Sequence, residues 1–319
     1  MSHFTRYVVF AFLATLLATV SSCRTTGNSS SGVEAFATPQ AAGDALVAAL
    51  KKNDKQALAR MFGEGSALLL TSGDPVADEQ QRERFVSKYA QKHTWDSSDE
   101  GVAVLDTGED GWPFPIPLMK DEAGWRFDTE QGSEEILNRR IGRNELDTIQ
   151  SCLAFVDAER EYYQRNPRSL ETPEYARFIL SSKGEKNGLY WETSTSEAPS
   201  PLGPLYGAAR SQGYSPTQGG RKPYHGYLYR VLHAQGPNAP GGAYDYMHDG
   251  EMTRGFALLA WPAKYGASGV TTFLVNQVGA LYEKDLGPKT DKIVTTLTVF
   301  DPDGSWAIVP ADAQTLPGS

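Results

Sequence analysis

Apolar residues recur at helical spacing in three stretches near the start of the chain, which predicts three helices. The first stretch follows Thr38 and Pro39, a good N-cap and a good first helical residue. Residues 53–62 form a second, shorter stretch, and the third opens at Asp74-Pro75. The apolar positions that define the three helices are Ala42, Leu46, Val47 and Leu50, then Leu58 and Phe62, then Phe85, Val86 and Tyr89.

Segments with strand character follow these helices. One strand is predicted around residues 102–105 and another from residue 115, and a turn at 121–124 leads into Gly124-Trp125-Arg126-Phe127-Asp128. Helices followed by hairpin strands predict an α+β domain over residues 35–132. The opening helix pair and the closing Gly-Trp-Arg-Phe strand are similar to the cone-shaped domains of the nuclear-transport-factor-2-like kind, and that resemblance implies a cone-shaped cavity.

The longest predicted helix lies in the middle of the chain. Ser133, followed by two glutamates, predicts a capped helix start, Gly142 is expected to end that helix, and Asn144 is expected to cap the next, over residues 144–165. A further short helix is predicted from Thr172-Pro173. The apolar face of the long helix consists of Leu146, Ile149, Leu153, Val156 and Tyr163.

The rest of the chain alternates strands with turns. Residues 184–222 are rich in Gly, Pro and Ser and contain one predicted helix near 205–210. Asp249-Gly250 is a strong signal for a two-residue hairpin. Strands are predicted at 224–232, 244–248, 252–261, 271–276 and 280–284. These elements predict a second α+β domain over residues 133–310, in which the long helix lies on an antiparallel sheet.

The N-terminus has the pattern of a secretory signal. Residues 7–20 are apolar and uncharged, and the run is too short to span a bilayer, which needs roughly 20 apolar residues. The segment Val20-Ser21-Ser22-Cys23 resembles the bacterial lipobox, which implies a lipoprotein signal peptide over residues 1–23, cut just before Cys23 so that Cys23 becomes the new N-terminus and carries lipid. The alternative is an ordinary signal with Cys23 incidental. Residues 24–34 are predicted to be a flexible tether. We therefore expect an exported envelope protein that faces the periplasm and is anchored to a membrane by lipid.

Composition narrows the function classes. Removing the signal leaves 29 basic and 39 acidic residues, a net charge of −10, and an acidic chain is a poor partner for nucleic acid. The sequence has no CxxC pair, HExxH, GxGxxG or P-loop, so no cofactor is predicted. Cys152 lies in an apolar helical stretch and is interpreted as a buried small hydrophobe.

Five motifs spread over much of the chain resemble those of a bacterial family designated domain of unknown function 2950. The motifs are Trp112-Pro113-Phe114-Pro115-Ile116-Pro117-Leu118, Arg139-Arg140-Ile141-Gly142-Arg143-Asn144-Glu145-Leu146, Pro201-Leu202-Gly203-Pro204-Leu205, Pro240-Gly241-Gly242-Ala243-Tyr244-Asp245-Tyr246 and Tyr282-Glu283-Lys284-Asp285-Leu286-Gly287. The resemblance implies an exported protein and supplies no activity. Many members carry an Asp- and Gly-rich loop after the long helix, but residues 165–170 contain no acid, so no calcium loop is predicted there.

Residues 144–286 are similar to the globular heads of type IV pilins and pseudopilins. The resemblance rests on Asn144-Glu145 at the start of a helix that ends in Tyr162-Tyr163, and on Gly226-Tyr227-Leu228-Tyr229 further along. A pilin carries an apolar spanning helix directly before this head, whereas residues 139–143 are charged here. The resemblance therefore implies the head architecture without pilin assembly.

Candidate catalytic and metal-binding residues are few. His225, His233 and His248 lie in the strand section, but zinc needs three or four converging ligands, so solvent-facing strand histidines are the favoured interpretation. Residues 301–305 and Ser268 lack the spacing of a calcium loop and of a nucleophile elbow, and both are predicted to be turns. We therefore predict no metal site and no catalytic residue.

Three further groups of side chains are candidates for contacts. Tyrosines on adjoining strands, with a nearby acid, form either a ligand or partner platform or a set of buried tyrosines with paired hydroxyls. Three arginines before the long helix either bind an anion or join the two domains, and contacts between the domains are the favoured interpretation. Four acids on that helix form paired carboxylates or a solvated face, and a solvated face is expected. The tyrosine group is Tyr224, Tyr227, Tyr229, Tyr244, Asp245 and Tyr246, the arginines are Arg139, Arg140 and Arg143, and the acids are Glu145, Asp157, Glu159 and Glu161.

The leading functional hypothesis is a non-enzymatic envelope protein with a structural or protein-binding role, because every recognisable catalytic pattern is missing from the sequence. A module that binds a small ligand or a peptide is the alternative, and a hydrolase of unrecognised type is the third. An apolar cleft lined by aromatic residues favours the ligand-binding module. Converging titratable groups in a deep pocket favour the enzyme, and a flat apolar patch favours a protein partner.

Overall fold

The N-terminal helices begin at the polar side chains that the sequence offers as caps. The Thr38 hydroxyl accepts a hydrogen bond from Ala41 N at 3.1 Å and starts α1 (Pro39–Lys52). Asp54 caps α2 (Lys55–Phe62), and Asp74 caps α4 (Pro75–Gln91). One further helix, α3 (Ala67–Leu70), was not predicted, since four residues are too few to show a period.

The structure is a computed structural model that describes residues 33–63, 66–215 and 222–314. The predicted signal peptide, Cys23 and nearly all of the predicted tether lie outside these residues.

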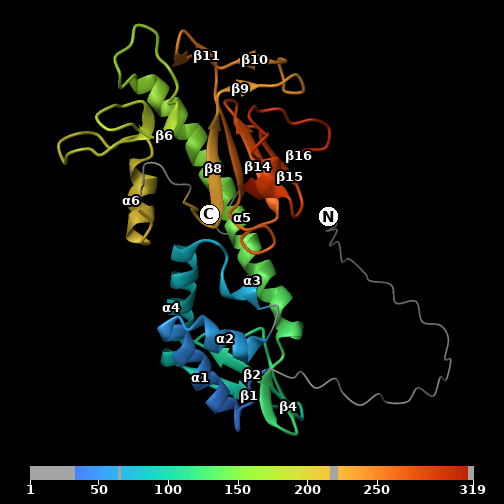
Figure 1. The fold of residues 1–319 in the computed structure, drawn as a ribbon. Coiled ribbons are helices and arrows are strands. Elements are labelled where there is room, and N and C mark those ends of the chain that lie inside the picture. The colour runs from blue at the N-terminus through green and yellow to red at the C-terminus, as the bar shows by residue number, and fades with distance from the viewer. Residues whose placement is uncertain (1–32, 64–65, 216–221, 315–319) are drawn as a thin grey trace, which may run out of the picture. The chain divides into compact units, whose positions relative to one another are not determined.

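These helices pack against an antiparallel sheet with strand order β1-β2-β4-β5, in which β3 also pairs with β2 (Figure 1). The strands are β1 (His93–Asp96), β2 (Val102–Thr107), β3 (Trp112–Pro113), β4 (Leu118–Asp121) and β5 (Gly124–Phe127). Strand β2 alternates between half-buried and buried residues, as a strand with one face on a core does. The core beneath it contains Leu46, Leu58, Phe62 and Leu118.

The predicted helix break at Gly142 is wrong. A single helix, α5 (Thr129–Arg165), runs through the predicted Ser133 start and is capped by Asp128 instead. Gly142 has no positive φ, and a glycine inside a helix costs only about 1 kcal/mol, which the surrounding packing offsets. Asn144 caps nothing; its side-chain amide donates to Ser268 O at 2.8 Å.

Helix α5 crosses the domain boundary that the sequence suggested between residues 132 and 133. Ile136, in its first third, packs against the N-terminal core, while Ile149, Cys152 and Val156 belong to the C-terminal core. The deeply buried stripe is rotated slightly from the predicted one, because Leu146 and Leu153 are only half-buried whereas Phe155 and Tyr162 are buried.

The C-terminal sheet against which α5 packs is antiparallel, with strand order β16-β15-β14-β13-β8 (Figure 1). Its strands are β8 (Tyr227–Leu232), β13 (Ala257–Pro262), β14 (Thr271–Asn276), β15 (Leu281–Asp285) and β16 (Ala307–Ile308). Every residue of β13 is buried. The prediction of a long helix on an antiparallel sheet is therefore confirmed, as is the α+β fold class.

Two predicted strands are shorter than expected. The strand predicted from residue 224 begins at Tyr227, because His225 and Gly226 have φ of 50° and 76°. A side chain at Gly226 would also lie 2.5 Å from the Asn144 amide. The predicted strand 252–261 is interrupted at Gly255, whose φ is 150°. The Asp249-Gly250 turn itself is confirmed, since β11 (Met247–His248) pairs with β12 (Glu251–Met252) around it.

The helix predicted from Thr172-Pro173 is absent from the described chain; the segment is extended and leads into β6 (Phe178–Leu180). Its backbone N–H groups bond outside the segment, since Tyr175 N donates to Met252 O and Ala176 N donates to the Glu159 carboxylate. These tertiary hydrogen bonds replace those of a helix.

The remaining elements are short. They are β7 (Gly188–Tyr190), parallel to β6, the pair β9 (Ala234–Gln235) and β10 (Tyr244–Asp245), α6 (Gly203–Ser211), α7 (Thr290–Ile293) and a 3₁₀ turn, η1 (Ala311–Gln314).

Candidate functional site

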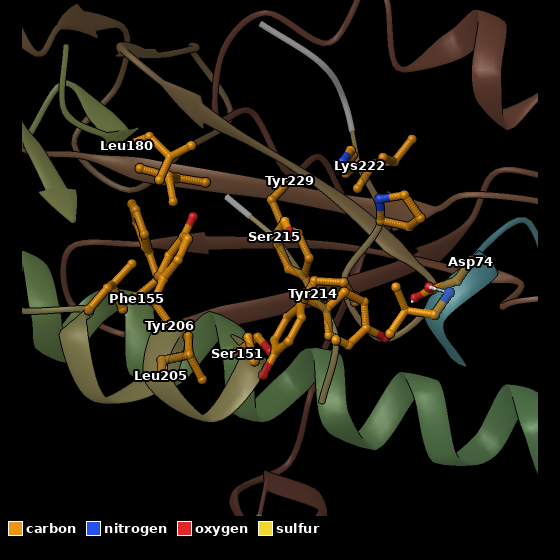
Figure 2. A pocket seen from close by; sticks show the side chains of 18 of the residues that line it. Asp74, Ser151, Phe155, Leu180, Leu205, Tyr206, Tyr214, Ser215, Lys222 and Tyr229 are labelled. Atoms are coloured by element: carbon orange, nitrogen blue, oxygen red, sulfur yellow. Dashed lines mark hydrogen bonds between the residues drawn. The ribbon is translucent and has the colours of Figure 1, made fainter. Parts of the chain in front are cut away.

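A cavity of about 740 Å³ opens where the start of α4, the middle of α5, helix α6 and strand β8 meet (Figure 2). This volume lies within the range of about 300–1,000 Å³ typical of small-molecule sites. The walls are mainly apolar and include Val76, Phe155, Leu202, Leu205, Leu228 and Leu258. Because four tyrosines complete the lining, we call it the tyrosine-lined cavity.

The four tyrosines are Tyr206, Tyr214, Tyr224 and Tyr229. The Tyr206 ring stacks on Tyr190 with centroids 4.2 Å apart, and Tyr214 meets Tyr224 edge to face at 5.0 Å. Burial raises the pKa of Tyr206 to about 12 and raises the pKa values of the other three as well. All four hydroxyls therefore stay neutral at physiological pH.

Two of these hydroxyls are available to a ligand. Within the described chain, the hydroxyls of Tyr206 and Tyr224 have no hydrogen-bond partner. By contrast, the Tyr214 hydroxyl donates to Asp74 at 2.9 Å, and that of Tyr229 lies 3.4 Å from Tyr224 O. An apolar cavity with a few unpaired polar groups is the usual form of a small-ligand site.

Asp74 supplies the carboxylate of the lining and is completely buried. One of its oxygens accepts from Val76 N and Ala77 N and so caps α4, and the other accepts from the Tyr214 hydroxyl and from Gly226 N, both at 2.9 Å. Four hydrogen bonds satisfy the group, so Asp74 fixes the wall and does not act on a ligand. The ammonium of the lining, Lys222, is exposed. The interior of the cavity therefore suits an uncharged ligand.

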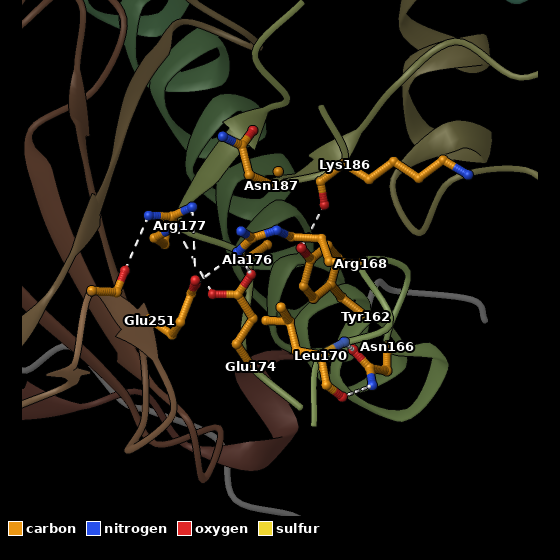
Figure 3. Close-up of polar contacts among 12 residues, drawn as sticks. Tyr162, Asn166, Arg168, Leu170, Glu174, Ala176, Arg177, Lys186, Asn187 and Glu251 are labelled. Carbon is orange, nitrogen blue, oxygen red and sulfur yellow. Dashed lines mark hydrogen bonds and ion pairs between the residues drawn. The ribbon is translucent and has the colours of Figure 1, made fainter. Parts of the chain in front are cut away.

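A second group of polar side chains joins the end of α5 to the β11–β12 hairpin (Figure 3). Arg168 pairs with Glu174 and, at 2.6 Å, with Glu251, while Arg177 lies 3.9 Å from each of these carboxylates. Glu174 is only 2% exposed, and burial is the main cause that raises its pKa. Two arginines against two carboxylates balance the charge, which is what a structural clamp requires.

Glu159 lies beside this clamp and is also completely buried. Its Oε2 accepts from Ala176 N at 2.8 Å, and burial raises its pKa well above the usual glutamate value. The expectation of a solvated face is therefore wrong for Glu159, although Asp157 is exposed as expected. Neither Glu159 nor Glu174 lines a described cavity, so these carboxylates give no support to a hydrolase.

The predicted tyrosine group does not form a single platform. Tyr224 and Tyr229 line the tyrosine-lined cavity, whereas the buried Tyr227 donates its hydroxyl to Thr271 O at 2.9 Å. Tyr246 is buried with its hydroxyl on Gln235, and Tyr244, in β10, accepts from the Gln277 amide. Asp245 is exposed and bonds Met247 N.

The histidines do not converge. His225 lies 3.3 Å from Asp147, His233 contacts Arg177 O, and His248 is beside Asp249 in the hairpin turn. Over the ranges that the structure describes, no group of three or more His, Cys, Asp or Glu residues could hold a metal ion. Ser268 is buried in a turn, where its hydroxyl donates to Lys264 O.

The three arginines of α5 contact the N-terminal region. Arg140 is buried and donates to Leu68 O and Leu69 O, both at 2.7 Å. Arg139 pairs with Glu135 and lies 5.3 Å from the centre of the Trp112 ring. All three arginines, Arg143 included, line a second cavity.

Sequence reasoning missed Tyr206, Tyr214 and Asp74 as site residues. The apolar face of the predicted helix at 205–210 was the available signal for Tyr206. Tyr214 lies in a Gly- and Ser-rich stretch without periodicity, and Asp74 was interpreted only as a helix cap. Their convergence depends on contacts between residues more than 100 positions apart, such as the hydrogen bond from Tyr214 to Asp74.

The family model of DUF2950, described as a protein of unknown function, matches residues 33–309. The chain belongs to the DUF2950 family. The match spans both sheets and α5, so the two regions form one family unit and the resemblance seen in the motifs is confirmed. Neither a curated protein nor a solved structure matches the chain. The nuclear-transport-factor-2-like and pilin-head comparisons therefore stay predictions.

Among the helices of the described ranges, none has the length and hydrophobicity needed to cross a membrane.

Proposed function

We propose that this DUF2950 protein binds an uncharged, largely apolar ligand in the tyrosine-lined cavity. The observation that carries the proposal is an apolar space of about 740 Å³ with the unpaired hydroxyls of Tyr206 and Tyr224 at its wall. Each ligand methylene that leaves water there contributes about 0.8 kcal/mol. A donor or acceptor on the ligand that meets a tyrosine hydroxyl fixes its orientation. Of the three hypotheses drawn from the sequence, the ligand-binding module has the most support.

The protein-binding hypothesis has less support. The exposed large hydrophobic residues of the described chain come from different segments and are Leu68, Met119, Phe178, Val278 and Ile308. Single exposed hydrophobic residues are normal on a protein surface and do not define an interface.

Filling the cavity tests the proposal. Ala209 is 8% exposed and lines the cavity, whereas its neighbour Ala208 on the same helix is exposed and does not. We expect Ala209→Trp to weaken binding of N-phenylnaphthylamine, an uncharged apolar fluorophore, at least tenfold, and Ala208→Trp to leave it unchanged. Ala209→Leu, a milder filling, should give an intermediate loss and guards against misfolding. Equal affinity in all four proteins would show that the probe binds elsewhere and would refute the proposal.

We further propose that the protein is an envelope lipoprotein anchored through Cys23 and facing the periplasm. The lipobox-like Val20-Ser21-Ser22-Cys23 supports this, and two or three acyl chains are enough for stable anchoring. Radiolabelled palmitate should enter the wild type and the Cys152→Ser control but not Cys23→Ser, since Cys152 is buried. Equal labelling of both variants, or none in any protein from a lipoprotein-competent host, contradicts the anchor.

A further inference from the structure

The second cavity has a different chemistry from the first. Its volume is about 370 Å³, and it lies in the N-terminal region among α1, α2, α4 and the first part of α5. Its floor is apolar and contains the buried core residues Leu46, Leu58, Phe62 and Ile116. This floor can hold hydrocarbon but has no group that would orient a ligand.

The rim of this cavity is strongly cationic. Six basic side chains line it against one acid, Asp78, in a chain whose overall net charge is −9. Asp78 is already engaged by the backbone N–H and the hydroxyl of Ser72. The six basic residues are Arg82, Arg84 and Lys88 on α4 and Arg139, Arg140 and Arg143 on α5. We call this site the arginine-rimmed cavity.

Part of this positive charge is not neutralised by the protein. Lys88 pairs with Asp110 and Arg139 pairs with Glu135. Arg84 and Arg143 form no ion pair within the described chain. Burial and then the like charge of Arg84 lower the pKa of Arg143, whereas Asp147 raises it in part. Both arginines are exposed at the rim, where an anion can reach them.

Arg140 adds a positive charge that forms no ion pair within the described chain. It is 6% exposed, and its two terminal nitrogens donate to the carbonyls of Leu68 and Leu69. Its Nε is buried and has no hydrogen-bond acceptor among the described residues. A buried donor without an acceptor costs about 1–3 kcal/mol, so Arg140 is held in place at a cost and its charge adds to that of the rim.

We infer that the arginine-rimmed cavity binds a single-chain anionic amphiphile, with its hydrocarbon chain on the apolar floor and its anionic head among Arg84, Arg140 and Arg143. Guanidinium groups form strong charge-assisted hydrogen bonds to carboxylate and phosphate oxygens. One anion between Arg84 and Arg143 also relieves their mutual repulsion. This site is separate from the tyrosine-lined cavity, whose interior is uncharged, and the inference does not depend on that proposal.

Calorimetric titration of the chain from residue 24 onward, produced without the signal peptide, tests the inference with decanoate, decyl phosphate and decanol. The two anions distinguish a carboxylate head from a phosphate head, and decanol has the same chain without a charge. We expect saturable one-to-one binding of at least one anion, at least tenfold tighter than decanol. Octanoate has two methylenes fewer than decanoate and should bind about tenfold more weakly than decanoate if the chain is buried.

Arg84→Gln/Arg143→Gln should weaken anion binding at least tenfold and leave decanol binding unchanged. Lys289→Gln/Lys292→Gln removes the same charge from exposed positions outside the cavity and should bind like the wild type. Melting curves of both double variants establish that they are folded. Equal affinity for decanol and for both anions, an equal loss in the two double variants, or no saturable binding overturns the inference. Loss of anion binding in Ala209→Trp also overturns it, because the anion would then occupy the tyrosine-lined cavity.

Discussion

Asp74 connects the cap of α4 to the wall of the tyrosine-lined cavity, and two substitutions separate these roles. Serine is also a good N-cap, so Asp74→Ser should still accept from Val76 N and Ala77 N. Its hydroxyl cannot at the same time replace the second carboxylate oxygen, which accepts from Tyr214 and Gly226. Asp74→Ala removes both sets of hydrogen bonds.

The structure gives the expected magnitudes. A hydrogen bond to a charged group is worth about 1.5–3 kcal/mol, and the Gly226 N–H would remain buried without its acceptor. Because such terms are not additive, Asp74→Ser should lower the free energy of unfolding by about 2–4 kcal/mol. Loss of an N-cap costs typically about 1 kcal/mol, so Asp74→Ala should be lower by about that much again.

Urea unfolding followed by tryptophan fluorescence measures these differences, provided that the m-value is unchanged and the transition is two-state. Asp54 is the matched control, because it caps α2 through Gln56 N and Ala57 N but is exposed. Asp54→Ala should cost about 1 kcal/mol and Asp54→Ser close to nothing. If Asp74→Ser stays within about 0.5 kcal/mol of the wild type, the link from Asp74 to Tyr214 and Gly226 contributes nothing and the reasoning fails.

Three further predictions concern α5. The folded-state pKa of Glu159 is raised, so its contribution to stability is present below pH of about 4.5 and is lost as pH rises through the folded pKa. The melting temperature of Glu159→Gln minus that of the wild type should therefore be larger at pH 8 than at pH 5, and an equal difference at both pH values contradicts this. Ile149→Ala should cost about 2–5 kcal/mol in urea unfolding and Leu153→Ala less, since Ile149 is 5% exposed and Leu153 is half-buried; the reverse order would be inconsistent with the orientation of α5. A fragment of residues 33–144 should unfold at a higher urea concentration than one of residues 33–132, because the shorter fragment lacks Ile136, which packs on the N-terminal core, and Arg140, which bonds Leu68 O. Equal unfolding midpoints would show that these two contacts do not stabilise the N-terminal region.

Local signals predicted the elements that depend on nearby residues. Thr38, Asp54 and Asp74 cap helices as expected, because a cap forms with backbone groups only two or three residues away. The Asp249-Gly250 hairpin was predicted for the same reason, since a two-residue turn with positive φ depends on the turn residues themselves.

The errors arose where distant contacts decide. Gly142 has the composition of a helix end, but the packing of α5 on two cores outweighs the cost of one glycine. Thr172-Pro173 has the form of a helix start, yet Tyr175 N and Ala176 N bond to Met252 and Glu159. A pattern within a short window contains no information about either partner.

The same limit explains why only half of the tyrosine-lined cavity was predicted. Tyr224 and Tyr229 are close in sequence to a strand with a clear pattern, so they were candidates. Tyr206 and Tyr214 reach the cavity from α6 and from the turn after it. Their positions depend on the tertiary placement of α6, which the sequence of that helix does not determine.

The composition of the arginine-rimmed cavity argues against an accidental gathering of surface charge. Basic residues make up 30 of 319 positions in the chain but 6 of the 22 residues that line this cavity. Acids make up 39 of the 319 positions and supply only one of those 22. Like charges placed together around an apolar floor destabilise the folded protein, so the arrangement costs stability unless something binds there. An anionic ligand reduces the repulsion, so its binding should raise the melting temperature of the wild type more than that of Arg84→Gln/Arg143→Gln.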